Sequence, residues 1–239
     1  MTVDFRVLKN SATPAVIEQM CLEMDRRMSM GEPDLGRAGD AHRWKIGNIG
    51  DADNPKEKYP VLTSWIHSTI QQEKLHLPPW NCRITFMAYV RQVRSNRLHT
   101  DHNPNQGRGH TILLPLRNIE PGVDRTVVFD HSTYVCPTVE KISSVDAQNR
   151  IIFDAHKNGP VIGNYIKQYQ LEHLQPAINH LRVAGVFEYN LGDAVCFDGH
   201  ALHASSNWQK HSPDRLHKDY VLIHTTDSKG RNFHESRDS

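Results

Sequence analysis

The sequence predicts a mainly β protein of the sandwich or barrel class. About seven or eight short segments either alternate apolar with polar residues or are rich in β-branched and aromatic residues, with turn residues between them. Helical periodicity is confined to the N-terminal part of the chain and to one segment in its middle. Two layers of strands, with helices covering one sheet, would account for this order of elements.

The length of the chain suits one domain. Its 239 residues are enough for a single β domain with a sizeable core. We expect one domain over 1–239, in which 1–80 supply a first strand and helices. Residues 83–130 and 185–225 are expected to form the strand core, and 131–184 an insertion.

Composition excludes several classes of protein. The chain carries 28 Lys and Arg against 27 Asp and Glu, so its net charge does not indicate nucleic-acid binding. It has no apolar run of ~18 residues and no basic leader followed by an apolar segment, so we expect no membrane partner. The four cysteines predict neither a zinc ribbon nor a disulfide framework, and we expect reduced thiols in a cytoplasmic protein. They are Cys21, Cys82, Cys136 and Cys196.

The N-terminal part is predicted to contain a strand and two helices. Residues 2–7 alternate apolar and polar side chains, as a short strand does. Thr13 followed by Pro14 is typical of a helix N-cap and first turn. Residues 31–58 are rich in Gly, Asp, Pro and Lys and predict a loop, and Pro60 begins a second amphipathic helix. The expected buried faces are Ile17, Met20, Cys21, Met24 and Met28 in the first helix, and Leu62, Trp65, Ile66, Thr69 and Ile70 in the second.

The core strands are predicted on both sides of the insertion. They are expected at 83–90, 111–116, 125–129, 185–189, 194–197 and 220–224. Within the insertion, apolar residues recur at helical spacing until Pro176 begins a second short helix. The apolar face consists of Val161, Ile162, Tyr165, Ile166 and Tyr169. This segment either covers a sheet or forms a roof over a functional site.

The stretch from Arg97 to Asn103 contains the most informative spacing in the chain. Residues i and i+2 of an extended strand point to the same face, so His99 and Asp101 can present a nitrogen and an oxygen to one metal ion. We assign His203 as the third ligand. Two His and one carboxylate form a facial set that suits non-haem Fe(II).

A chance His-x-Asp spacing is the alternative, because the chain contains 16 histidines. Two features of the surrounding sequence favour the metal site. A predicted strand at 83–90 leads towards His99, and another at 194–197 precedes His203.

The later segment adds a family resemblance. His203-Ala204-Ser205-Ser206-Asn207, followed by Arg215, resembles the Fe(II)/2-oxoglutarate-dependent oxygenase superfamily, and most closely its phytanoyl-CoA dioxygenase-like or prolyl hydroxylase-like branch. The resemblance spans roughly residues 83–225. It implies a double-stranded β-helix (a cupin-like jelly roll), whereas the strand pattern alone predicts only a sandwich or barrel.

The resemblance also implies roles for individual residues. His99, Asp101 and His203 would hold Fe(II), and Arg215 would bind the far carboxylate of 2-oxoglutarate. Assisting contacts are expected from Ser205 or Asn207. Arg215 is rather far from the distal His for this family, which leaves Lys218 as a rival, and His102 and His200 are the rival metal ligands.

The implied activity is hydroxylation of a C–H bond with O₂ and 2-oxoglutarate, giving succinate and CO₂. Because Asp101 supplies a carboxylate, hydroxylation is favoured over halogenation. Two alternatives stay open: a jelly-roll metal enzyme that does not use 2-oxoglutarate, and a non-catalytic binding or sensing module. The substrate, small molecule or macromolecule, is not identified by the sequence.

Overall fold

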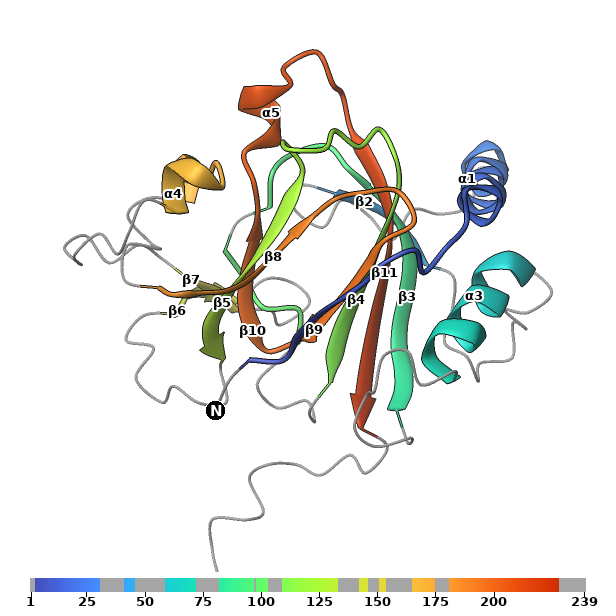
Figure 1. Ribbon diagram of the computed structural model, residues 1–239, viewed down its shortest axis with the longest axis horizontal. Helices are drawn as coiled ribbons and strands as arrows, with labels where there is room; N and C mark the ends of the chain where they lie inside the picture. Colours follow the sequence, from blue (N-terminus) through green and yellow to red (C-terminus); the bar gives the residue numbers. More distant parts are fainter. Residues whose placement is uncertain are drawn as a thin grey trace, which may run out of the picture.

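Two antiparallel sheets form the body of the molecule (Figure 1). The computed structural model describes residues 3–30, 41–45, 59–71, 82–96, 98–102, 109–132, 142–145, 151–153, 165–174 and 181–227. The strands are β1 (Phe5–Leu8), β2 (Ala41–Lys45), β3 (Cys82–Gln92), β4 (His110–Arg117), β5 (Arg125–Ser132), β6 (Ile142–Val145), β7 (Ile151–Phe153), β8 (Val183–Glu188), β9 (Ala194–Asp198), β10 (Ala201–Ser205) and β11 (Lys218–Asp227). The large sheet has the order β1-β9-β4-β11-β3-β2, the small sheet has the order β10-β5-β8, and β6 pairs with β7.

The path of the chain between the sheets defines the fold. The chain passes from β3 in the large sheet to residues 98–100, which border the small sheet through a bridge between His99 and His203. It continues through β4 in the large sheet, β5 and β8 in the small sheet, β9 in the large, β10 in the small and β11 in the large. This alternation is the double-stranded β-helix, so the predicted jelly roll is confirmed.

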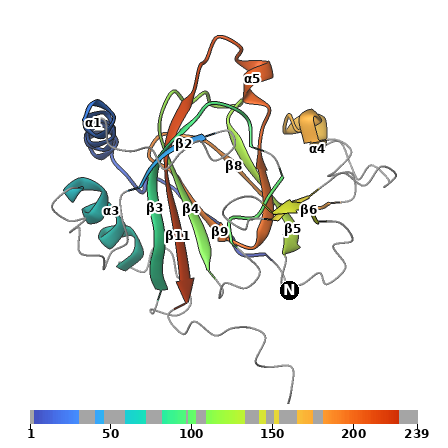
Figure 2. The same cartoon turned by 180° about the vertical axis from the view of Figure 1, so that it is seen from behind.

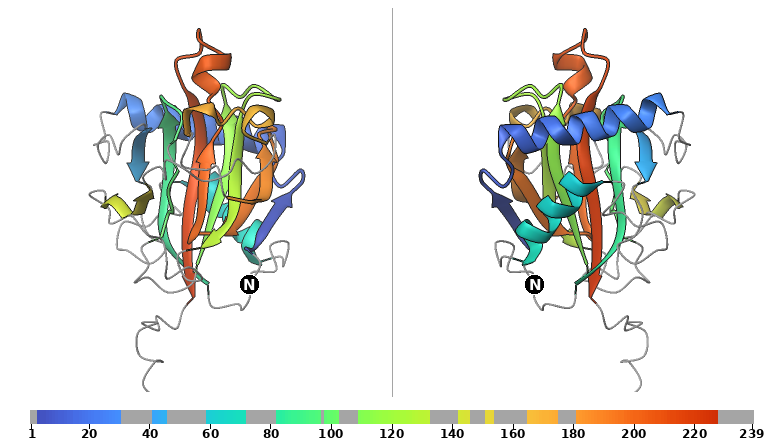
Figure 3. Two further views of the ribbon diagram at one scale, coloured as in Figure 1. Left: turned by 90° about the vertical axis from the view of Figure 1, so that its left-hand side faces the viewer. Right: turned by 90° about the vertical axis from the view of Figure 1, so that its right-hand side faces the viewer.

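Two helices cover the outer face of the large sheet (Figures 2 and 3). They are α1 (Pro14–Ser29) and α3 (Pro60–Gln71), each of which begins at the predicted proline. Thr13 caps α1 as predicted, since its hydroxyl accepts a hydrogen bond from the Val16 backbone N–H at 3.4 Å. The helices and the sheet share one apolar cluster that includes Met20, Met24, Leu62, Trp65, Met87, Ile112, Leu114, Val221 and Ile223.

Successive side chains along β11 point alternately to the two faces of the large sheet. Val221 and Ile223 face the helices. Tyr220 and Leu222 face the interior between the sheets, where they join a second apolar cluster with Phe187 and other residues. Lys218 has the same parity as Tyr220 and is fully buried. The interior face of β11 therefore carries a lysine close to the apolar core of the jelly roll.

Residues 165–174 cover the outer face of the small sheet. They contain α4 (Tyr165–Gln168) and a 3₁₀ turn, η1 (Glu172–Leu174). Ile166, Leu171 and Leu174 are buried in a third apolar cluster. Their partners from the sheet and its border are Leu98, Val127, Phe129, Leu202 and Ala204. Residues 165–174 thus match the covering alternative, whereas Val161, Ile162 and the helix expected at Pro176 lie outside the described residues.

Four strands were not predicted: β2, β6, β7 and β10. β6 and β7 lie within 131–184, where we expected helices rather than strands. β2 lies in the stretch 31–58, which we expected to be a loop, and it pairs with β3 from the edge of the large sheet. An edge strand has one partner only, so its sequence need not be apolar. β10 follows β9 after only Gly199 and His200. Because the two strands are so close in the sequence, we predicted only the first of them. None of the helices in the described residues is both long and apolar enough to span a membrane.

Candidate metal centre and the adjoining pocket

The backbone brings His99 and His203 together. The two residues face each other across an antiparallel bridge, in which the His99 N–H donates to the His203 carbonyl at 3.0 Å and the His203 N–H donates to the His99 carbonyl at 2.9 Å. Directly opposed residues of antiparallel strands project to the same face. Their imidazole centroids are 4.3 Å apart.

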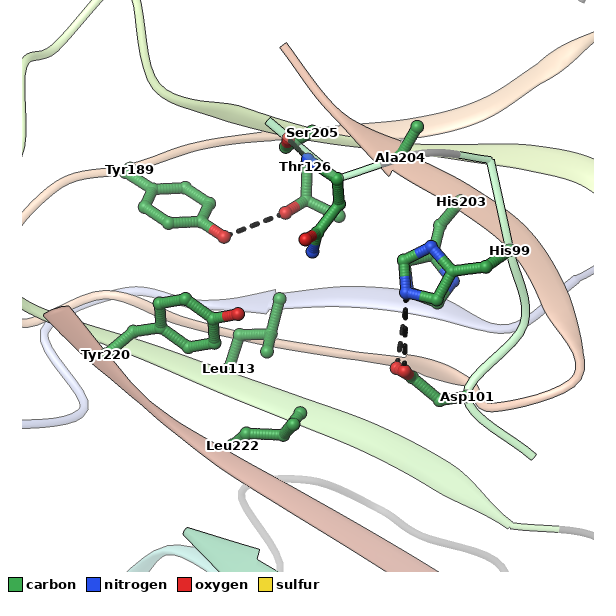
Figure 4. A pocket seen from close by; sticks show the side chains of 11 residues that line it. His99, Asp101, Leu113, Thr126, Tyr189, His203, Ala204, Ser205, Tyr220 and Leu222 are labelled. Atoms are coloured by element: carbon green, nitrogen blue, oxygen red, sulfur yellow. Dashed lines mark hydrogen bonds and ion pairs between the residues drawn. The ribbon is translucent and has the colours of Figure 1, made fainter. Parts of the chain in front are cut away.

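Asp101 completes a group of three donors (Figure 4). Its backbone N–H donates to the carbonyl of Gly199 at 3.1 Å, which fixes the bend after His99. Its Oδ1 lies 3.6 Å from His99 Nε2, and its Oδ2 lies 3.2 Å from His203 Nε2. One donor atom from each residue lies within 4.8 Å of the others, and within the described ranges this is the one His, Cys, Asp or Glu cluster with that geometry.

The carboxyl group of Asp101 is ionised. Burial raises the pKa of the Asp101 carboxyl, but the imidazoles of His203 and His224 and hydrogen bonds outweigh burial, and the pKa lies well below its usual value. The carboxylate is therefore anionic at neutral pH. His203 Nδ1 is 3.1 Å from the Ala201 carbonyl, so the tautomer that donates there leaves Nε2 as the metal-binding atom.

A pocket opens from the metal centre into the space between the sheets (Figure 4). Leu113 and Leu222 contribute apolar wall, while Thr126, Tyr189 and Tyr220 contribute hydroxyl-bearing side chains. The hydroxyls of Thr126 and Tyr189 are hydrogen-bonded at 2.9 Å. Burial raises the pKa of Tyr189, so its hydroxyl keeps its proton. The complete lining is Asn96, His99, Asp101, Leu113, Thr126, Tyr189, His203, Ala204, Ser205, Tyr220 and Leu222.

Lys218 lies behind the Tyr189 side of this pocket. Its side chain is fully buried, with Nζ 4.4 Å from the centroid of the Tyr189 ring and 3.3 Å from Asp124 Oδ1. Burial lowers the pKa of the Lys218 ammonium to about 8, against the opposite effect of the Asp124 carboxylate. From the sequence alone, Lys218 was only the alternative to Arg215 for binding the far carboxylate of 2-oxoglutarate.

Arg215 is directed to the same carboxylate as Lys218. Its guanidinium donates to both oxygens of Asp124, with Nη2 2.9 Å from Oδ1 and Nη1 in contact with Oδ2. Nη1 also donates to the Asn118 carbonyl at 3.1 Å, and the guanidinium lies 4.7 Å from the centroid of the Trp208 ring. Neither Arg215 nor Lys218 is among the residues that line the pocket.

Ser205 and Asn207 have different surroundings. Ser205 lines the pocket, and its hydroxyl accepts a hydrogen bond from the Asn96 N–H at 2.6 Å. Asn207 lies before the short helix α5 (Trp208–His211), donates its backbone N–H to the Gln170 carbonyl at 2.8 Å and does not line the pocket. Only Ser205 of the two is therefore beside the candidate metal centre.

His102 and His200 lie outside the group of three donors. Both are buried, and the His102 ring centroid is 5.2 Å from that of His200 and 5.4 Å from that of His224. A Cβ on Gly109 or Gly199 would lie about 2.5 Å from atoms of the His102 ring, so both positions require glycine for this packing. Burial and then the charge of His224 lower the pKa of His102 to about 3.

Comparisons with known proteins give matches among solved structures only. No family model matches the chain, and no curated protein matches it. HygX from Streptomyces hygroscopicus, solved with nickel and 2-oxoglutarate, is 10% identical with a TM-score of 0.54 over 95% of this chain and 84% of HygX. SnoK, a non-haem 2-oxoglutarate-dependent carbocyclase of nogalamycin biosynthesis, is 10% identical with a TM-score of 0.61 over 94% of this chain and 81% of SnoK.

A prolyl hydroxylase from Trichoplax adhaerens, solved with a peptide of hypoxia inducible factor, gives a third match. It is 13% identical with a TM-score of 0.52 over 95% of this chain and 85% of the hydroxylase. The matched enzymes include a carbocyclase and an epimerase as well as a hydroxylase, so this fold serves several reactions. At these identities the likeness concerns the fold: the chain has the jelly-roll fold of solved non-haem 2-oxoglutarate-dependent enzymes.

Proposed function

We propose that this protein is a non-haem Fe(II)- and 2-oxoglutarate-dependent dioxygenase that hydroxylates a C–H bond of its substrate. The observation that carries the proposal is the His99, Asp101 and His203 group at one end of a jelly-roll pocket. Two imidazole nitrogens and one carboxylate oxygen on one side of an ion are the donor set of non-haem Fe(II) oxygenases. The solved structures with this fold, which include enzymes bound to a metal and 2-oxoglutarate, add support.

The three side chains fit a divalent metal in both charge and protonation. Asp101 supplies one negative charge, and its low pKa keeps that charge at neutral pH. When bound, Fe(II) would supply the redox chemistry that couples decarboxylation of 2-oxoglutarate by O₂ to oxidation of the substrate. One oxygen atom of O₂ enters succinate and the other enters the hydroxylated product, with release of CO₂.

The protein's own part is to hold the reactants and to limit access of water. All three ligand residues have at most 9% of their surface exposed. Leu113 and Leu222 supply apolar wall beside them, so charges in the pocket are weakly screened. Because one of the Thr126 and Tyr189 hydroxyls donates to the other, the pair has one hydroxyl proton left to donate to an anionic co-substrate.

The far carboxylate of 2-oxoglutarate is assigned to Lys218. Arg215 and Lys218 carry two positive charges beside the single carboxylate of Asp124, so this buried group has one positive charge in excess. A second carboxylate would neutralise it. The Arg215 guanidinium is already hydrogen-bonded to both oxygens of Asp124. Lys218 lies two residues before the pocket residue Tyr220 on β11, so its side chain leaves the strand on the same side as that of Tyr220. Arg215 then orients Asp124, and Asp124 orients the ammonium.

The experiment is an assay of succinate formation by the purified protein with Fe(II), ascorbate and 2-oxoglutarate. Slow uncoupled turnover needs no knowledge of the substrate. We expect succinate formation that requires the metal and O₂, is absent in Asp101→Ala and is unchanged in His211→Ala, which alters an exposed histidine on α5. Metal binding without succinate would favour a jelly-roll metal enzyme of another type. Absence of metal binding would favour a non-catalytic module.

A further inference from the structure

One oxygen of the Asp101 carboxylate has a hydrogen-bond donor outside the metal-binding group. The Thr111 hydroxyl donates to Asp101 Oδ2 at 2.8 Å. The other atoms near Oδ2 are His203 Nε2 at 3.2 Å and His224 Nε2 at 3.8 Å, the latter beyond hydrogen-bond distance. Thr111 is fully buried, so water does not compete for this contact.

The two partners differ in how firmly the backbone holds them. Thr111 lies in β4 between two neighbouring strands, opposite Phe197 of β9 and His224 of β11. Its β-branched side chain restricts rotation about χ1, so the direction of the hydroxyl is set by the sheet. Asp101 lies in a bend after an isolated bridge, and a carboxylate there can rotate about its own side-chain bonds. The orientation of the carboxylate therefore depends on a side-chain partner.

We infer that Thr111 is a positioning residue for the metal ligand Asp101. Its hydroxyl holds the carboxylate plane so that an oxygen is presented to the same point as the Nε2 atoms of His99 and His203. The inference rests on the metal centre of the proposed function. It does not depend on 2-oxoglutarate or on any reaction at the site. Partners of this kind contribute about 10–100-fold to metal affinity.

The test measures Ni(II) affinity of the metal-free, full-length protein by titration calorimetry, without 2-oxoglutarate. Thr111→Val removes the hydroxyl and keeps the side-chain shape. Thr111→Ser keeps the hydroxyl, and Thr111→Ala differs from Thr111→Ser by that hydroxyl alone. We expect the Kd for Ni(II) to rise about 10–100-fold in Thr111→Val and Thr111→Ala, and less than about threefold in Thr111→Ser. The Tm of the metal-free variants reports any loss of folding separately.

A double variant distinguishes positioning from a general effect on the fold. In an Asp101→Ala background the hydroxyl has no carboxylate to orient, so adding Thr111→Val should not weaken the remaining Ni(II) binding further. Equal affinity of Thr111→Ser and Thr111→Ala would overturn the inference, as would an undiminished effect of Thr111→Val in the Asp101→Ala background. Wild-type protein that fails to bind Ni(II) would overturn the metal centre as well. Normal metal binding without succinate formation would contradict only the proposed reaction.

Discussion

His99 and His203 exchange both backbone hydrogen bonds of an antiparallel pair, at 3.0 Å and 2.9 Å, and their imidazoles lie on one face as a direct result. The sheet therefore sets the separation of the two nitrogen donors before any metal is bound. Asp101 completes the group from the bend two residues after His99, where the Gly199 carbonyl accepts its backbone N–H and the Thr111 hydroxyl donates to its carboxylate.

The first prediction concerns the three metal ligands. His99→Ala, Asp101→Ala and His203→Ala each remove one of three donors, so none of them should retain a stoichiometric Fe(II) or Ni(II) ion in equilibrium dialysis at low metal concentration, although the two donors that remain should still bind Ni(II) weakly. His102→Ala and His200→Ala should retain one bound ion, because neither side chain belongs to the donor group. Loss of the ion in His200→Ala, together with its retention in His203→Ala, would show that the distal ligand is misassigned.

The second prediction concerns the co-substrate carboxylate. Lys218→Met removes the ammonium and keeps most of the side-chain volume, and it leaves Arg215 paired with Asp124. A hydrogen bond to a charged group is worth ~1.5–3 kcal/mol, so the KM for 2-oxoglutarate should rise by about one to two orders of magnitude. Initial rates of succinate formation against 2-oxoglutarate concentration give this value.

Arg215 provides the comparison for that experiment. Arg215→Ala leaves Lys218 to pair with Asp124 alone, so we expect a smaller rise in KM than in Lys218→Met. A large rise in the KM for 2-oxoglutarate in Arg215→Ala, with an unchanged KM in Lys218→Met, would show that Arg215 binds the far carboxylate, as we expected from the sequence.

The third prediction is a pH dependence. The Lys218 ammonium binds a carboxylate only when protonated, and burial lowers its pKa to about 8. Deprotonation as the pH rises through about 8 should lower kcat/KM for 2-oxoglutarate. The pH profile of Lys218→Met should lack this decrease, because methionine does not titrate in that range. A decrease of the same size in both proteins would assign the titration to another group.

The lowered pKa of Lys218 also affects folding stability. Its folded-state pKa lies below the usual lysine value of 10.5, so the unfolded chain binds more protons between pH 8 and pH 10.5. The contribution of this group to the free energy of unfolding therefore rises with pH across that window. The same buried charge that would bind the co-substrate thus destabilises the fold at neutral pH.

The fourth prediction concerns the segment that covers the small sheet. Leu171 is fully buried against that sheet, on the side away from the pocket. Leu171→Ala should lower the free energy of unfolding by ~2–5 kcal/mol, the usual cost of such a cavity, and leave metal affinity unchanged. Leu191→Ala is the control, because Leu191 is 59% exposed. Wild-type stability in Leu171→Ala, with loss of coupled turnover, would favour the roof alternative instead.

The sequence predicted those parts of the site that depend on local spacing. His99 and Asp101 are two residues apart at a strand end, and the same-face rule applies to them without knowledge of the fold. An apolar run and a turn mark the segment that holds His203, and the family resemblance of the residues that follow it, 204–207, favoured it over His200. The two helices over the large sheet were recognisable for the same reason, since their apolar faces repeat within a few residues.

The remaining features depend on which distant residues the fold brings together. The pairing of Arg215 with Asp124 could not be predicted, because nothing near Arg215 in the sequence marks Asp124 as its partner. The hydrogen bond from Thr111 to Asp101 crosses from the large sheet to the bend beside the small sheet. Only the alternation of β11, which places Lys218 on the same side as Tyr220, offered a local signal for the buried lysine.

The most direct test of the central claim is release of CO₂ from 2-oxoglutarate labelled at its 1-carboxylate. The wild-type protein with Fe(II) and O₂ should release labelled CO₂ and form one succinate for each CO₂. Asp101→Ala, or the wild-type protein without O₂, should release none above background. Equal release by wild-type protein and Asp101→Ala, or none by wild-type protein with its metal bound, would contradict the assignment as a 2-oxoglutarate-dependent dioxygenase.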